Sequence, residues 1–318
     1  MKPFRLPSIF LIVIFVFNIC FIPSQYALAS PAADENPYSD RVRFERLTVE
    51  DGLPNATVLS VLQDKQGFMW FATADGLSRY DGYSFTTFRH DINNPNSLSN
   101  NNTFALLETH DGLIWVGTDP GGLNVYDPET GKFSVYRHDE ADPNSLSDDS
   151  VWSLMEAADG SIWVGTRGGL SRLDRTSGTF KNYVNNPDDP SSLPGAVIYR
   201  MYQDSSDTIW LGMREGLVRY NPETDDFTVF INNPDDPTTI SSNNVWAMLE
   251  DSQGEFWVGT RGGGLNQFDR ASGKFTAYRN NPNNPATISS DRLWNIFEDS
   301  NGNLWVLTEN GTATIGSW

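Results

Sequence analysis

The stretch that decides the fold reads Asn244-Val-Trp-Ala-Met-Leu-Glu-Asp-Ser-Gln-Gly-Glu-Phe-Trp-Val-Gly-Thr-Arg-Gly-Gly-Gly-Leu-Asn-Gln-Phe-Asp269. Near-copies recur along the chain, and the second tryptophan of the stretch marks each one: Trp70, Trp115, Trp163, Trp210, Trp257 and Trp305. Their spacings are 45, 48, 47, 47 and 48 residues. A repeat of this length is a supersecondary unit that cannot bury its apolar face alone, so we expect neighbouring copies to stack.

Each copy predicts four short antiparallel strands. In the quoted copy they cover residues 245–249, 256–260, 265–268 and 274–278, and Gly, Asn, Asp or Pro bounds each of them. Linkers rich in Pro, Asn and Asp, such as 185–190, separate the copies, and proline keeps them outside the sheets. Four-stranded sheets repeated at this period favour an all-β fold, the β-propeller, with the six tryptophans packed between adjacent blades.

The number of blades follows from counting complete strand sets. Five sets lie near 57–90, 103–138, 150–184, 196–231 and 244–279, and a sixth at 292–318 lacks its fourth strand. Segment 41–48, ahead of the first set, resembles an orphan fourth strand. We therefore expect about six blades, the last completed by the N-terminal strand. Truncation of a longer protein is the alternative, because the last copy is degenerate.

The N-terminus predicts export. Lys2 and Arg5 precede an apolar run over 9–22, and Ala27-Leu-Ala29 forms a cleavage-type site. We expect a signal peptide over 1–29, a linker over 30–40, a propeller domain over 41–318, a periplasmic location and no membrane span after cleavage. An uncleaved anchor is the alternative.

Composition excludes several classes of function. Cys20 is the only cysteine and lies within the expected signal peptide, which leaves no disulfide or thiolate metal site in the mature chain. The net charge is −19, which disfavours binding to nucleic acid and to anionic lipid. The Asp- and Asn-rich linkers lack the regular spacing of a calcium loop. We expect no metal and no cofactor.

The sequence of the repeats resembles that of a known family. Leu47-Thr-Val-Glu-Asp-Gly-Leu-Pro-Asn55, followed by segments 61–73 and 76–82, resembles the opening of the two-component regulator propeller sensors, and the resemblance extends over 41–311. It implies an extracytoplasmic ligand sensor for signal transduction. In similar proteins propellers precede an immunoglobulin-like domain, a membrane helix and a histidine kinase or diguanylate cyclase. The chain shows no kinase or cyclase segment, so we expect no catalysis by it, and receptor domains as partners.

Two sets of repeat positions are candidates for binding a small molecule or oligosaccharide. Four residues beyond each marker tryptophan, three copies carry arginine, which suits a carboxylate, sulfate or phosphate. The alternative, which we favour, is that these arginines pair with acidic residues such as Glu215. The full set is Ala74, Asp119, Arg167, Arg214, Arg261 and Glu309.

The second set occupies the first strand of each copy: Leu59, Phe104, Trp152, Tyr199, Trp246 and Trp294. Aromatic rings at this position favour core packing, and stacking on sugars is the alternative. From the two sets we take Arg167, Arg214, Arg261, Asp119, Trp152, Tyr199, Trp246 and Trp294 as candidate ligand-binding residues.

Two other functions stay open: a propeller lyase or glycosidase, and a purely structural ring that binds a protein partner. The chain has three histidines, of which His90 and His138 occupy matching repeat positions and His110 lies in a turn. No acid stands apart from the repeat, so we assign no catalytic residue.

Overall fold

The structure is a computed structural model and describes residues 46–315. The chain divides into a unit of residues 1–46 and a unit of residues 47–318, and every described strand belongs to the second. The expected signal peptide, its cleavage site and Cys20 lie outside the described residues, and their assignment stays a prediction.

The described chain contains one short 3-10 helix, Val49–Asp51, followed by strands. The first three sheets comprise β1 (Val58–Gln63), β2 (Met69–Thr73), β3 (Gly76–Tyr80) and β4 (Phe85–Phe88); β5 (Thr103–Glu108), β6 (Ile114–Thr118), β7 (Gly122–Asp127) and β8 (Lys132–Tyr136); β9 (Val151–Glu156), β10 (Ile162–Thr166), β11 (Leu170–Asp174) and β12 (Thr179–Tyr183). The other three comprise β13 (Ile198–Gln203), β14 (Ile209–Met213), β15 (Leu217–Asn221) and β16 (Asp226–Phe230); β17 (Val245–Glu250), β18 (Phe256–Thr260), β19 (Gly264–Asp269) and β20 (Lys274–Tyr278); β21 (Leu293–Glu298), β22 (Leu304–Thr308) and β23 (Gly311–Ile315).

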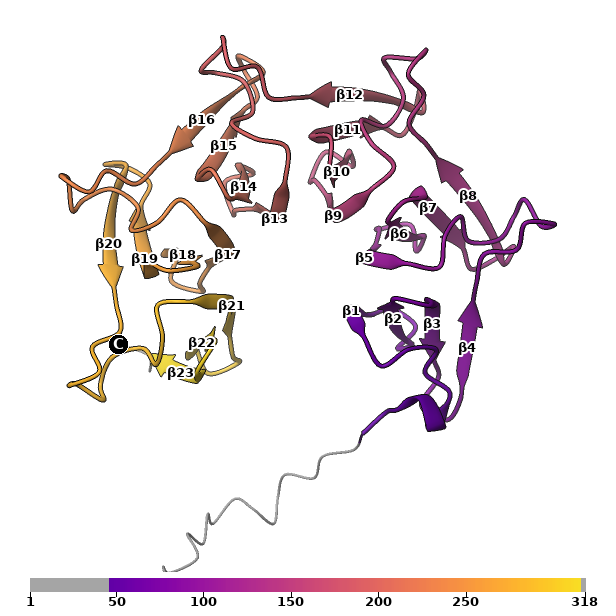
Figure 1. Ribbon diagram of the computed structural model, residues 1–318, viewed down its shortest axis with the longest axis horizontal. Coiled ribbons are helices and arrows are strands. Elements are labelled where there is room, and N and C mark those ends of the chain that lie inside the picture. The colour runs from indigo at the N-terminus through magenta and orange to yellow at the C-terminus, as the bar shows by residue number, and fades with distance from the viewer. Residues whose placement is uncertain (1–45, 316–318) are drawn as a thin grey trace, which may run out of the picture. The chain divides into compact units, whose positions relative to one another are not determined.

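Each sheet is an antiparallel meander in which strands pair in chain order, and each forms one blade. The first strand of every blade lies innermost, and in the four-stranded blades the fourth lies outermost, as β9 and β12 illustrate in Figure 1. Consecutive inner strands contact one another from β1 through to β21. The predicted six-bladed β-propeller is therefore confirmed.

The sixth blade has three strands within the described residues. Most of segment 41–48, which we expect to supply the fourth, lies outside them, and its described end, residues 46–48, forms no strand. Completion of this blade by the N-terminal strand stays a prediction.

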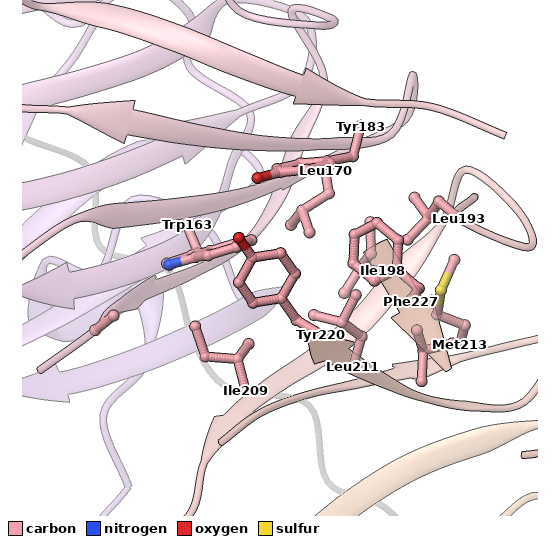
Figure 2. Packing of buried hydrophobic residues seen from close by; sticks show 12 residues of the cluster. Trp163, Leu170, Tyr183, Leu193, Ile198, Ile209, Leu211, Met213, Tyr220 and Phe227 are labelled. Atoms are coloured by element: carbon pink, nitrogen blue, oxygen red, sulfur yellow. The ribbon is translucent and has the colours of Figure 1, made fainter. Parts of the chain in front are cut away.

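The marker tryptophans pack between blades, as predicted. Trp163 of β10 stacks on Tyr183 of its own blade at 5.9 Å and meets the edge of Tyr220 from the next blade at 4.9 Å (Figure 2). Five of the six are at most 4% exposed. Trp305, in the last blade, is 39% exposed, because no described blade follows it.

A carboxylate six residues earlier holds each of four marker tryptophans. Asp204 accepts the backbone N–H groups of Ser206 and Thr208, both at 3.0 Å, and the indole N–H of Trp210 at 2.9 Å. Asp64, Asp251 and Asp299 accept the indole N–H of their own blades in the same way. One side chain thus closes the hairpin and satisfies the buried indole.

Neighbouring blades are also joined by a repeated hydrogen bond, here termed the inter-blade clasp. A side chain at the end of each of the inner strands β5, β9, β13, β17 and β21 accepts a backbone N–H from the first hairpin of the preceding blade, at 2.6–2.9 Å. The acceptors are Glu108, Glu156, Gln203, Glu250 and Glu298, and the donors are Lys65, His110, Ala158, Ser205 and Ser252. Five consecutive interfaces are therefore fixed in one register.

Candidate functional site

Every inner strand carries a β-bulge at its second residue. In β13 the pairing with β14 shifts between Ile198 and Arg200, so that Tyr199 has no partner residue on β14. The other five inner strands shift at the same place. The bulge residues are Leu59, Phe104, Trp152, Tyr199, Trp246 and Trp294, the complete second candidate set, here termed the bulge row. A bulge re-aims a side chain and often lies next to a functional site.

The bulge row is not core. Four of its members are partly buried, and Leu59 and Trp294, at its two ends, are exposed. Neighbouring rings contact one another: Tyr199 stacks on Trp246 with centroids 4.6 Å apart, and Trp246 meets the edge of Trp294 at 5.3 Å. We expected these rings to pack in the core. They do pack against one another, but they are not fully buried, because the bulge keeps part of the ring surface in contact with solvent.

The turn positions of the first candidate set lie beside the start of the inner strand in their own blades. The backbone N–H of Arg167 donates to Ser150 at 2.9 Å, and that of Arg261 donates to Asn244 at 2.8 Å. Asp119 is held in the same way by Asn102, at 3.0 Å. Since the bulge is the second residue of the inner strand, both candidate sets lie at one end of the blades.

Arg261 forms the closest link between the two sets. Its guanidinium carbon lies 4.9 Å from the ring centroid of Trp246 and 4.2 Å from that of Trp294, in reach of cation–π attraction to both. Its Nε is buried without a hydrogen-bond partner among the described residues. Asp119 contributes a second link, since its carboxylate accepts the indole N–H of Trp152 at 3.3 Å.

The arginines do not pair with acids as expected. Within residues 46–315 none of Arg167, Arg214 and Arg261 forms an ion pair, and the first two are exposed. Glu215, the expected partner, has a buried carboxylate oxygen with no hydrogen-bond partner in the described chain. By contrast, six other arginines pair with carboxylates: Arg89, Arg137, Arg172, Arg175, Arg270 and Arg292.

Sequence reasoning missed one cation on the inner strands. Arg200 of β13 follows the bulge residue Tyr199, is exposed, and lines a pocket of about 220 Å³ together with Phe104 and Trp152. The signal was available, because the same position in the other copies holds small or neutral residues: Ser60, Ala105, Ser153, Ala247 and Asn295.

A larger hollow of about 730 Å³ lies at the third blade and reaches its outer strand β12. Its arginines are already neutralised: Arg172 pairs with Asp159 at 2.6 Å, and Arg175 lies 3.6 Å from Glu156. We attribute this hollow to blade scaffolding, because its cations stabilise neighbouring hairpins.

The histidines have structural partners. Nδ1 of His90 and of His138 lies 2.8 and 2.7 Å from the carbonyl oxygens of Leu98 and Leu146. Asn185, Asn232 and Asn280 make the same contact in the other linkers. His110 lies 2.6 Å from Glu156, next to an inter-blade clasp. Their environments are those of repeat scaffolding rather than of a shared catalytic centre.

Residues 46–315 include no helical segment with the length and hydropathy of a membrane span. Over the same residues, no three His, Cys, Asp or Glu side chains come together as metal ligands would.

The repeats match the sequence profile of a known protein family. The sequence profile described as two component regulator propeller matches six segments: 52–75, 97–119, 145–168, 192–215, 239–262 and 287–310. Histidine kinase P4 of Formosa agariphila is 38% identical over 56 residues, which are 18% of this chain and 4% of that protein. The chain thus matches only a small part of this curated relative.

Solved structures agree on the fold. The extracellular domain of a hybrid two component system from B. thetaiotaomicron is 27% identical, with a TM-score of 0.65 over 85% of this chain and 41% of that one. A streptogramin B lyase is 16% identical, with a TM-score of 0.57 over 84% of this chain and 85% of that one, a likeness of fold alone. With six matched repeats on six blades, the chain belongs to the two component regulator propeller family.

Proposed function

We propose that this propeller is the extracytoplasmic ligand-sensing module of a two-component-type receptor, and that it binds an oligosaccharide or another small polar ligand on the bulge row. The likeness to an extracellular domain of a hybrid two component system supports the sensor role. The kinase or other output activity belongs to receptor domains that act with it, and a periplasmic location follows from the expected signal peptide.

Two observations together carry the proposal: every inner strand has a bulge, and three arginines at the same end of the blades have no counter-ion among residues 46–315. Partly exposed rings offer flat apolar surfaces to sugar faces, and guanidinium groups at the same end of the blades offer paired donors to polar substituents. The chain carries a net charge of −19, yet within residues 46–315 none of these three arginines forms an ion pair with a carboxylate. A few convergent polar groups over an apolar floor are typical of small-molecule sites.

A glycan array probed with residues 30–318 tests the proposal. Calorimetry with a positive glycan then compares the wild type with the triple variant Arg167→Gln, Arg214→Gln and Arg261→Gln. We expect the triple variant to bind at least tenfold more weakly, since hydrogen bonds to charged groups contribute about 1.5–3 kcal/mol each.

The matched control removes three positive charges from the outer strands β8, β12 and β20, through Lys132→Gln, Lys181→Gln and Lys274→Gln. We expect its affinity to equal that of the wild type. A blank array would contradict an oligosaccharide ligand, and equal affinities for both triple variants would contradict binding beside the three arginines.

A lyase is the weaker candidate. Lyases share the fold at 16% identity, but the three histidines of this chain make the scaffold contacts described above. Mass spectrometry of complex glycans and cyclic depsipeptides after incubation with the chain should show no new products. A ring that serves only to bind proteins would leave the glycan array blank.

A further inference from the structure

We infer that Arg200 and the pocket it lines form a subsite for the carboxylate of an acidic sugar, such as a uronic acid. The inference rests on the proposed function, because it specifies the chemistry of the ligand that the bulge row receives.

The pocket is built by inner strands alone. Its lining comes from β1, β5, β9 and β13, so four successive blades contribute to one hollow of about 220 Å³. Phe104 and Trp152, two members of the bulge row, lie in its wall with their rings 25° from parallel and their centroids 6.4 Å apart. The wall is otherwise aliphatic or hydroxylic: Leu59, Ser60, Ala105, Leu106, Ser153, Leu154 and Met201.

Arg200 is the single charged residue in this lining. The blade architecture does not require it, since the other five copies place Ser, Ala or Asn there and form the same bulge. Packing therefore does not explain an arginine in the fourth blade.

The guanidinium of Arg200 has no counter-ion in the part of the chain that the structure describes. Among residues 46–315 no carboxylate lies within ion-pair distance of it and no acceptor hydrogen-bonds to it, although the protein is strongly acidic. A planar cation that lines a pocket attracts an anion that can accept two parallel hydrogen bonds, which a carboxylate does. The neighbouring aromatic rings favour a flat, partly apolar body, and a sugar ring that carries a carboxylate meets both demands.

Calorimetry with trigalacturonic acid and with neutral galactotriose tests the subsite. We expect the wild type to bind the acidic trisaccharide more tightly. Arg200→Gln should weaken binding of the acid by about 10- to 100-fold and leave binding of the neutral sugar unchanged. Arg200 is exposed and has no ion-pair partner among the described residues, so we expect the variant to keep the wild-type unfolding midpoint.

Lys132→Gln is the matched control, because it removes one positive charge from the outer strand β8. We expect it to leave both affinities unchanged. The subsite is refuted if Arg200→Gln binds trigalacturonic acid as tightly as the wild type, or if the wild type binds the acidic and neutral sugars equally. Binding of the neutral sugar alone would overturn the subsite and leave the proposed function standing, whereas binding of neither sugar together with a blank glycan array would overturn both.

Discussion

At the scale of the residue, the marker tryptophans stabilise the blades by filling the space between them. Trp210 packs against Phe256 at 5.1 Å and Phe268 at 5.5 Å, both from the following blade. We predict that Trp210→Ala lowers the free energy of unfolding by about 3–5 kcal/mol, through lost burial and the cavity left behind. Urea denaturation monitored by circular dichroism measures this loss.

Trp305→Ala supplies the comparison. The same side chain is 39% exposed in the last blade, so its removal should cost clearly less than removal of Trp210. Equal losses at the two positions would show that packing between blades is not what these tryptophans provide.

Asp204 predicts a dependence of stability on pH. Burial raises the pKa of its carboxyl, but hydrogen bonds from Trp210, Thr208 and Arg270 lower that pKa by more, so the net pKa lies below its usual value. Because the folded-state pKa lies below the unfolded one, ionised Asp204 stabilises the fold above about pH 4. This contribution is lost as pH falls through the folded-state pKa.

Asp204→Asn should therefore destabilise the protein by about 1–3 kcal/mol at pH 7 and reduce the further loss between pH 5 and pH 2. Thermal unfolding across that range is the measurement. Asp235→Asn, at an exposed linker position, is the control and should leave the pH profile unchanged. A wild-type profile in the Asp204 variant would contradict the assigned role.

At the scale of the element, the inter-blade clasp fixes the register between blades. Glu298 accepts the backbone N–H of Ser252 at 2.8 Å and its hydroxyl at 2.5 Å. We predict that Glu298→Ala lowers the free energy of unfolding by about 1 kcal/mol, a modest value because the contact is exposed.

Glu298→Gln should be nearly neutral, since Gln203 accepts the same hydrogen bond between the third and fourth blades. Chemical denaturation of both variants checks the prediction. If the glutamine variant lost as much stability as the alanine variant, charge rather than hydrogen bonding would hold the clasp.

The elements were predictable where the signal is local. Strands, hairpins and linkers follow from residues close in sequence, such as Asp204 and Trp210. The clasps join residues 43 to 46 positions apart, and their acceptors recur visibly, but only the stacked blades show what they bind. The bulges could not be predicted from the sequence, because the alternation of apolar and polar residues does not reveal a shift in the pairing between the first and second strands of a blade. The arginines were misjudged, since composition alone suggested acidic partners.

At the scale of the whole molecule, the first and last blades each keep one apolar face uncovered by described residues. Val61 of β1 is 51% exposed, and Phe297 of β21 is 58% exposed. If segment 41–48 adds the fourth strand of the sixth blade, as the sequence predicts, its deletion should lower the unfolding midpoint. Deleting the same number of residues from the linker, 31–38, should leave the midpoint unchanged. Equal midpoints for both deletions would contradict this way of completing the blade.

We propose that the bulges turn a repeated scaffold into a binding surface on the inner strands. The most direct test is a crystal structure of the chain with the tightest ligand from the glycan array. We predict electron density for the ligand on β5, β9 and β13, in contact with Trp152 and Arg200. Density for the ligand only at the outer strands or the first hairpins, with the inner strands empty, would contradict the account.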